Sequence, residues 1–126
     1  MKIILNKKIY LFTIAFMLYM PNITNAASIY FDSDQNEFFV GDTIILNVRL
    51  DTQDKNINVI EGDININCLD KQISLSDISI SDSVFSLWPR KPSISLDSKI
   101  ISFTGGVPDG VNSKNATIFK IILNLK

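Results

Sequence analysis

Apolar and polar residues alternate along most of this chain after residue 26, which is the pattern expected of half-buried β-strands. The clearest run covers residues 43–50 and follows a turn signal at Gly41-Asp42. Its inward positions are predicted to be Ile44, Leu46, Val48 and Leu50, and its outward positions Thr43, Asn47 and Arg49. The pattern predicts an all-β domain without a convincing helix.

A second strand is predicted around residues 60–68. Its inward positions are Ile60, Ile64, Ile66 and Cys68, and its outward, solvated positions are Glu61, Asp63, Asn65 and Asn67. Gly62 falls on the inward face, where it predicts a bulge or a close approach of the facing sheet. The lone Cys68 is expected to be a small buried apolar residue, with an intermolecular disulfide as the lesser alternative.

The apolar positions change parity twice, between Val59 and Ile60 and again between Leu75 and Ile78, near Asp77. A β-bulge accommodates a slip of one residue, so a bulge is predicted at each place.

Further strands are predicted at residues 84–88, 94–96, 100–104 and 116–125, with a turn at Gly105-Gly106. In the last strand Phe119, Ile121, Leu123 and Leu125 are predicted to point inward. Seven or eight strands at this spacing imply two packed antiparallel sheets.

The N-terminus has the pattern of a signal peptide. Three lysines precede a twelve-residue apolar run at residues 9–20, and Pro21 ends that run. A helix of that length reaches only about 18 Å, short of the roughly 30 Å core of a membrane. We expect cleavage after Ala26, with Ala27 as the alternative, which leaves one secreted domain at residues 27–126 and no membrane span.

Charge and composition exclude several function classes. Of the 12 basic residues, three lie in residues 1–26, which hold no acids, so nine basic and 13 acidic residues remain and the net charge is −4. An acidic chain argues against nucleic acid as a partner. Without histidine and with one cysteine, the chain cannot build a Ser-His-Asp or Cys-His arrangement or a common zinc site. We therefore expect no catalysis, no cofactor and no metal.

Pairs of acidic residues are the remaining candidates for a catalytic or metal site. Asp32 and Asp34 with Glu37, and Asp51 with Asp54, are close in sequence, and a glycosidase needs only two carboxyl groups. Both groups lie in polar, turn-like segments, which favours solvated loops. Calcium binding at residues 32–37 is a lesser alternative.

Trp88 has two interpretations. It can stack on a sugar ring from an exposed position, or it can cover one end of the core with its indole N–H bonded to backbone. The segment that follows it, Pro89-Arg90-Lys91-Pro92, predicts solvent-exposed charges at Arg90 and Lys91.

Five segments in order resemble a cohesin domain of the kind found in exported bacterial surface proteins. They are residues 40–43 (VGDT), 57–62 (INVIEG), 83–88 (SVFSLW) with Pro92 after them, 101–110 (ISFTGGVPDG) and 118–121 (IFKI). The resemblance implies a nine-stranded jelly-roll sandwich, related to carbohydrate-binding modules, that binds dockerin modules whose calcium sits in the dockerin. The family's Asn-x-Asp contact pattern corresponds here to Val59-Ile60-Glu61, which keeps only the acid.

The family pattern continues for one or two strands beyond Lys126, so we expect a jelly roll that lacks its last one or two strands. Such a sandwich would expose an edge along residues 116–125, partly protected by Lys120 and Lys126, with Ile118 and Ile122 pointing outward. Edge-strand self-association is a further expectation.

These patterns predict a non-catalytic, extracellular recognition module at the bacterial cell surface. It would bind a dockerin-type protein module or a polysaccharide through a sheet face carrying Glu61, Asp63, Asn65 and Asn67. The alternative is a structural or adhesive module that spaces other domains.

Overall fold

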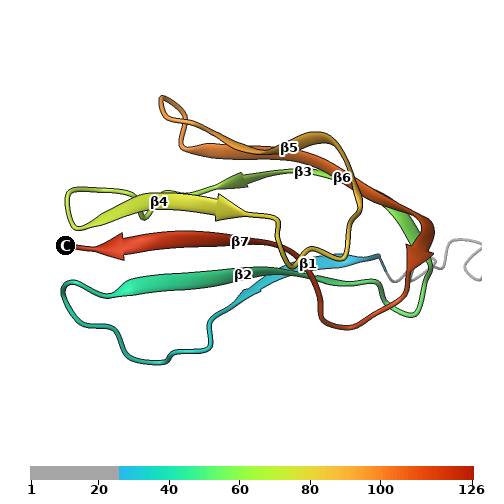
Figure 1. The fold of residues 1–126 in the computed structure, drawn as a ribbon, viewed down its shortest axis with the longest axis horizontal. Coiled ribbons are helices and arrows are strands. Elements are labelled where there is room, and N and C mark those ends of the chain that lie inside the picture. The colour runs from blue at the N-terminus through green and yellow to red at the C-terminus, as the bar shows by residue number, and fades with distance from the viewer. Residues whose placement is uncertain (1–25) are drawn as a thin grey trace, which may run out of the picture.

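The computed structural model describes residues 26–126, and every regular element in that part of the chain is a β-strand (Figure 1). The predicted signal peptide lies outside the described residues except for Ala26, so cleavage at Ala26 or Ala27 stays a prediction. The strands are β1 (Ser28–Asp32), β2 (Thr43–Asp51), β3 (Ile57–Asn65), β4 (Ile73–Ser79), β5 (Leu87–Ser95), β6 (Ile100–Val111) and β7 (Ala116–Leu125).

The strands form two antiparallel sheets that face each other as layers (Figure 1). The four-stranded sheet has the order β1-β2-β7-β4, and the three-stranded sheet has the order β3-β6-β5. Between the layers, the ring of Phe103 on β6 meets that of Phe119 on β7 edge-on at 5.1 Å, and both are buried. The prediction of an all-β body made of two antiparallel sheets is confirmed.

The alternation in β2 and β7 is largely as predicted. Val48 and Leu50 are fully buried, and the bounds of β7 match the predicted strand. Ile118, however, was expected to point outward and is fully buried. The register shifts there, because Val48 pairs with Phe119 while the next residue, Arg49, pairs with Thr117. The extra residue resets the parity, so that Ile118 and Phe119 both face the core.

The prediction that the last strand forms an exposed edge is wrong. β7 lies inside the four-stranded sheet, hydrogen-bonded to β2 on one side and β4 on the other (Figure 1). Pairing partners far apart in sequence decide which strand is an edge, and the alternation within one strand carries no information about them. The end strands are β1 and β4 in one sheet and β3 and β5 in the other.

A break in strand register lies near each of the two predicted parity switches. One lies between Ile57 and Val59 in the β3–β6 pair, and the other between Leu75 and Asp77 in the β4–β7 pair. The bulge predicted near Asp77 is therefore confirmed. No bulge lies between Val59 and Ile60, whose pairing with β6 is continuous, and the extra residues at the earlier break belong to β6, between Gly106 and Val111.

Gly105 and Gly106 do not form the predicted turn. They lie in the middle of β6, where Gly105 pairs with Ile60 and Gly106 with Val59. A Cβ atom on Gly105 would lie 2.7 Å from ring atoms of both Phe85 and Trp88. Glycine is required at this position because two aromatic rings rest against the backbone. A close approach of this kind is one of the reasons for a glycine within a strand.

The prediction of two separate strands at residues 84–88 and 94–96 is also wrong. Residues 84–86 are not in a strand, and a single strand, β5, runs from Leu87 to Ser95. It contains Pro89 and Pro92, and its register with β6 shifts on either side of Arg90. Proline lacks the N–H that a central strand needs, so it is tolerated here on an edge strand with irregular pairing.

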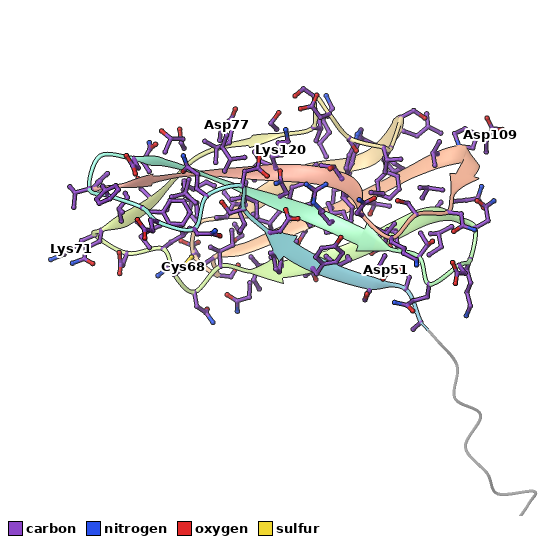
Figure 2. The ribbon with its side chains drawn as sticks, turned by 90° about the horizontal axis from the view of Figure 1, so that it is seen from below. Asp51, Cys68, Lys71, Asp77, Asp109 and Lys120 are labelled. Carbon is purple, nitrogen blue, oxygen red and sulfur yellow. The ribbon has the colours of Figure 1, made fainter. Side chains whose placement is uncertain are left out.

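Two expectations for the end of β3 change as well. Because β3 ends at Asn65, Cys68 lies in the following turn region and is exposed rather than buried (Figure 2). Gly62 does have a close neighbour, since a Cβ there would lie 3.2 Å from the ring of Phe103. That ring belongs to the paired residue on β6 of the same sheet, not to the facing sheet.

A polar cluster ties the edge strand β1 to the four-stranded sheet. The Arg49 Nε donates to Asp32 Oδ2 at 2.7 Å, and the Asn47 Nδ2 donates to Asp32 Oδ1 at 3.0 Å. Arg49 Nη1 also donates to Thr117 Oγ1 at 2.9 Å, so the cluster spans β1, β2 and β7. The amide of Asn47 and then the guanidinium of Arg49 lower the pKa of Asp32 below its ordinary value of 3.8.

Candidate functional site

The acidic residues singled out in the sequence lie on the outer face of β3. Glu61, Asp63 and Asn65 are exposed, and Ile60 and Ile64, at positions of the opposite parity, pack against the core, as alternation along a strand requires. Asn67 is exposed too, but it follows the end of β3 and is not part of the same row. Three of the four predicted residues therefore share one strand face.

The strand register extends this face across the three-stranded sheet. Cross-strand partners point to the same side, so each outward residue of β3 begins a row that continues on β6 and β5. The rows are Val59–Gly106–Leu87, Glu61–Thr104–Arg90, Asp63–Ser102–Ser93 and Asn65–Ile100–Ser95. No other described strand covers the outer side of this sheet (Figure 1).

One end of this face is apolar and hollow. Val59 is 62% exposed and Leu87 54% exposed, and Gly106 between them has no side chain. The resulting hollow has a volume of about 240 Å³ and is also lined by Pro89 and Pro108. It is large enough to receive an apolar side chain from a partner.

The middle of the face is charged. The Ser102 hydroxyl donates to the carboxylate of Asp63. Glu61 and Arg90 lie in one row with Thr104 between them, and neither forms an ion pair or side-chain hydrogen bond with another described residue. One acid and one base on the face are thus free to pair with a ligand.

Trp88 lies on the opposite side of this sheet. Its ring meets that of the buried Phe85 edge-on at 5.7 Å, and both rings rest on Gly105. It is half-buried against the core, and no indole hydrogen bond to another described residue is formed. The placement agrees with the core interpretation, apart from the expected hydrogen bond, and keeps the ring off the face that carries Glu61.

The other acids do not gather into a chemical site. Asp32 is held by Arg49 and Asn47, and Asp51 accepts a hydrogen bond from the backbone N–H of Gln53 in the β2–β3 turn. Among residues 26–126, no three acids or cysteines approach closely enough to hold a metal ion. The same residues include no helix of the length and apolar character needed to cross a bilayer.

Sequence reasoning missed half of this face. The sequence marks Val59 only as a replacement for an amide, and no pattern in it assigns Leu87, Pro89 or Pro108 to a site. The parity of Val59 with Glu61 was the available signal for one of them. The partners on β5 could not be identified, because the register of β5 contains two shifts.

Comparison with known proteins adds no assignment. No protein-family model, no curated protein and no solved structure matches this chain. The candidate site is therefore described by its own geometry.

Proposed function

We propose that this chain is a non-catalytic, extracellular recognition module that binds a protein partner through the outer face of the sheet β3-β6-β5. The observation that carries the proposal is the change along this face from an apolar end to a charged middle. An apolar hollow between Val59 and Leu87 adjoins an unpaired acid, Glu61, and an unpaired base, Arg90. Interfaces commonly combine an apolar anchor point with charged groups that fix the orientation of the partner.

The cohesin resemblance is part of this proposal, and it makes a dockerin-type module the first partner to test. The seven described strands compare with nine in the jelly roll that the resemblance implies. One or two further strands would extend the four-stranded sheet beside β1, one of the four end strands that have a side without a described partner. Secretion and a position at the bacterial cell surface belong to the same proposal.

A protein partner is favoured over a polysaccharide by the composition of the face. Recognition of sugar rings by stacking needs a flat aromatic ring that is open to solvent. The outward rows contain no aromatic residue, and Trp88 packs against Phe85 on the other side of the sheet. A polysaccharide therefore remains the second candidate.

A binding titration with calcium-loaded dockerin modules tests the proposal, with cellulose and xylan as the polysaccharide probes. We expect saturable binding to a dockerin and at least a tenfold loss of affinity in the variant Glu61→Ala plus Asp63→Ala. The matched control is Asp34→Ala plus Glu37→Ala, which removes the same charge from an exposed loop. That control should bind like the parent.

A second variant tests the apolar end. Leu87→Asp places a charge in the hollow without removing a buried side chain, so the fold should persist while dockerin binding is lost. If none of the dockerin and polysaccharide probes binds, the alternative of a structural or adhesive spacer module replaces recognition.

A further inference from the structure

The four sheet edges fall into two pairs that differ in how they are protected. β5 carries Pro89 and Pro92, and the register of β4 breaks next to the exposed Asp77. Prolines and bulges are features by which proteins prevent an edge from accepting another strand. β1 has no proline, lysine or bulge, and β3 has none over residues 59–65, where its pairing with β6 is continuous.

The two edges without proline, lysine or bulge border one apolar opening. A hollow of about 310 Å³ is lined by Ile29 and Phe31 of β1, Ile64 of β3 and Phe103 of β6. A neighbouring hollow of about 240 Å³ reaches Leu46, Ile121 and Leu123 in the facing sheet. The opening therefore leads from two free backbone edges into the core, and β1 and β3 lie along the same side in Figure 2.

Side chains at this opening are exposed although they point inward. Ile29 pairs with the buried Leu50, and Phe31 with the buried Val48, so both belong to the inner face of their sheet. Even so, Ile29 is 37% exposed and Phe31 is 46% exposed. An added strand beside β3 would direct every second side chain toward this surface and remove it from water.

The charges beside this edge determine which side chains are favoured at the outward-facing positions of such a strand. Residues of an added strand that do not face the opening would stand next to Glu61 and Asp63 on the outer face of β3. Opposite charges at neighbouring positions across two strands stabilise their pairing, so lysine or arginine is favoured there. The described chain is acidic, with nine basic and 13 acidic residues in residues 27–126.

A second copy of this chain fits the edge poorly. Antiparallel pairing of β3 with β3 of another copy would place Glu61 and Asp63 near the same two acids of that copy. Like charges directly opposite each other destabilise a strand pair. The outward acid of β1, Asp32, would bring no cation either, since it is already paired with Arg49.

We propose that the edge of β3 accepts an extended segment of a partner protein, in which apolar residues alternate with lysine or arginine, as an additional strand. Its backbone pairs with residues 59–65, its apolar side chains cover Phe31 and Ile64, and its cations face Glu61 and Asp63. This is strand addition, a recognised mode of peptide binding. It goes beyond recognition by the sheet face, because it uses the backbone edge and the opening between the sheets.

Three eight-residue peptides test this inference on the purified chain. The first alternates valine with lysine, the second alternates valine with glutamate, and the third is the first with a proline at a central valine. We expect saturable binding of the first peptide and slower amide hydrogen exchange at residues 59–65. The second peptide should bind at least about tenfold more weakly, because two cross-strand charge pairs become repulsive. The third peptide should not bind, since it keeps the charge and loses the backbone pairing.

A charge-reversal variant provides the matched control. Glu61→Lys plus Asp63→Lys changes only exposed side chains, so the fold should persist and the preference between the first two peptides should reverse. The variant Leu87→Asp should keep peptide binding, because Leu87 lies on β5, at the other edge of the sheet. This variant separates a failure of strand addition from a failure of recognition by the sheet face.

Three results would overturn the inference. One is equal affinity for the valine–lysine peptide and its proline version, which would indicate attraction by charge alone. Another is binding without protection of residues 59–65. The third is a dimer in sedimentation whose amides at residues 59–65 are already protected, which would show that a second copy occupies the edge.

Discussion

The outer faces of the two sheets use their charged residues differently. On the four-stranded sheet, Arg49 is bonded to Asp32 on β1 and Thr117 on β7, and Lys120 pairs with Asp82 at 2.8 Å. On the three-stranded sheet, Glu61 and Arg90 lie in one row without meeting. The first face uses charge to hold strands together, and the second leaves charge available. The charges of the four-stranded sheet thus have a structural role, and the unpaired charges lie on the face that we propose for a partner.

The largest loss of stability should come from a substitution on the inner side of the three-stranded sheet, where aromatic rings pack tightly on the backbone. Gly105→Ala places a Cβ 2.7 Å from the rings of Phe85 and Trp88, so the rings must move. Overpacking of this kind costs about 2 kcal/mol, which corresponds to a decrease in melting temperature of roughly 10 °C for a domain of this size. Thermal denaturation followed by circular dichroism measures this.

Gly62→Ala is the matched control for that prediction. Its Cβ would approach only the outer end of the Phe103 ring, at 3.2 Å, and the loss of stability should be clearly smaller. An unchanged melting temperature for Gly105→Ala would show that the two rings do not rest on β6.

The second effect tests the structural role of the polar cluster. Arg49→Met keeps the length of the side chain and removes its bonds to Asp32 and Thr117. The free energy of unfolding should fall by about 1–2 kcal/mol, since hydrogen bonds to charged groups are involved and the cluster is partly shielded from water. Urea denaturation provides the measurement.

Lys120→Met serves as the comparison within the same sheet. It removes one ion pair whose acid, Asp82, is largely exposed, so its effect should stay below about 0.5 kcal/mol. Equal effects of the two substitutions would contradict the assignment of Arg49 as the residue that holds β1.

A smaller effect should appear in the pH dependence of stability. The pKa of Asp32 is lowered in the folded state, so its contribution is present above the unfolded value of 3.8 and is lost as the pH falls through the folded value. The parent should therefore melt at a higher temperature than Asp32→Asn at pH 6, and this difference should shrink below pH 3.8. A difference that stays constant from pH 6 to pH 2 would argue against an ionised Asp32 in the cluster.

The pKa of Asp70 is also lowered, by the backbone N–H groups of Ile73 and then Gln72. Asp32→Asn leaves that contribution in place. The variant should therefore retain part of the acid sensitivity of the parent.

The smallest effect is expected on the face proposed for binding. Glu61→Ala plus Asp63→Ala removes two exposed carboxylates, of which only Asp63 has a described partner, Ser102. The free energy of unfolding should change by less than about 0.5 kcal/mol. A larger loss, measured by the same urea denaturation, would give these acids a structural role and remove the contrast between the two faces.

Local pattern was sufficient for much of the fold. The alternation predicted β2 and β7 well, and the parity switch near Asp77 located a bulge, because both depend on which side of a strand faces water. Pairing between strands that are distant in sequence could not be predicted from the local pattern. The position of β7 inside its sheet and the bulge at Ile118 depend on β2 and β4, which lie far away in sequence.

The candidate site also has a part that local alternation predicts and a part that depends on strand pairing. Glu61, Asp63 and Asn65 follow from alternation within β3, whereas the apolar hollow requires knowing that Leu87 lies opposite Gly106. The turn predicted at Gly105-Gly106 is wrong because glycine pairs are common in turns as well as at close contacts. The packing of Phe85 and Trp88 on Gly105, and of the Asn58 carbonyl on Gly106, depends on the tertiary structure.

The interior position of β7 also sets the order in which the molecule can assemble. During synthesis, β2 and β4 leave the ribosome long before residues 116–125, and neither has the neighbour that joins them until those residues emerge. The four-stranded sheet therefore cannot grow progressively from its N-terminal side and closes in one late step. A nascent or prematurely terminated chain without residues 116–125 would expose the apolar faces of β2 and β4, and exposed faces of this kind favour aggregation.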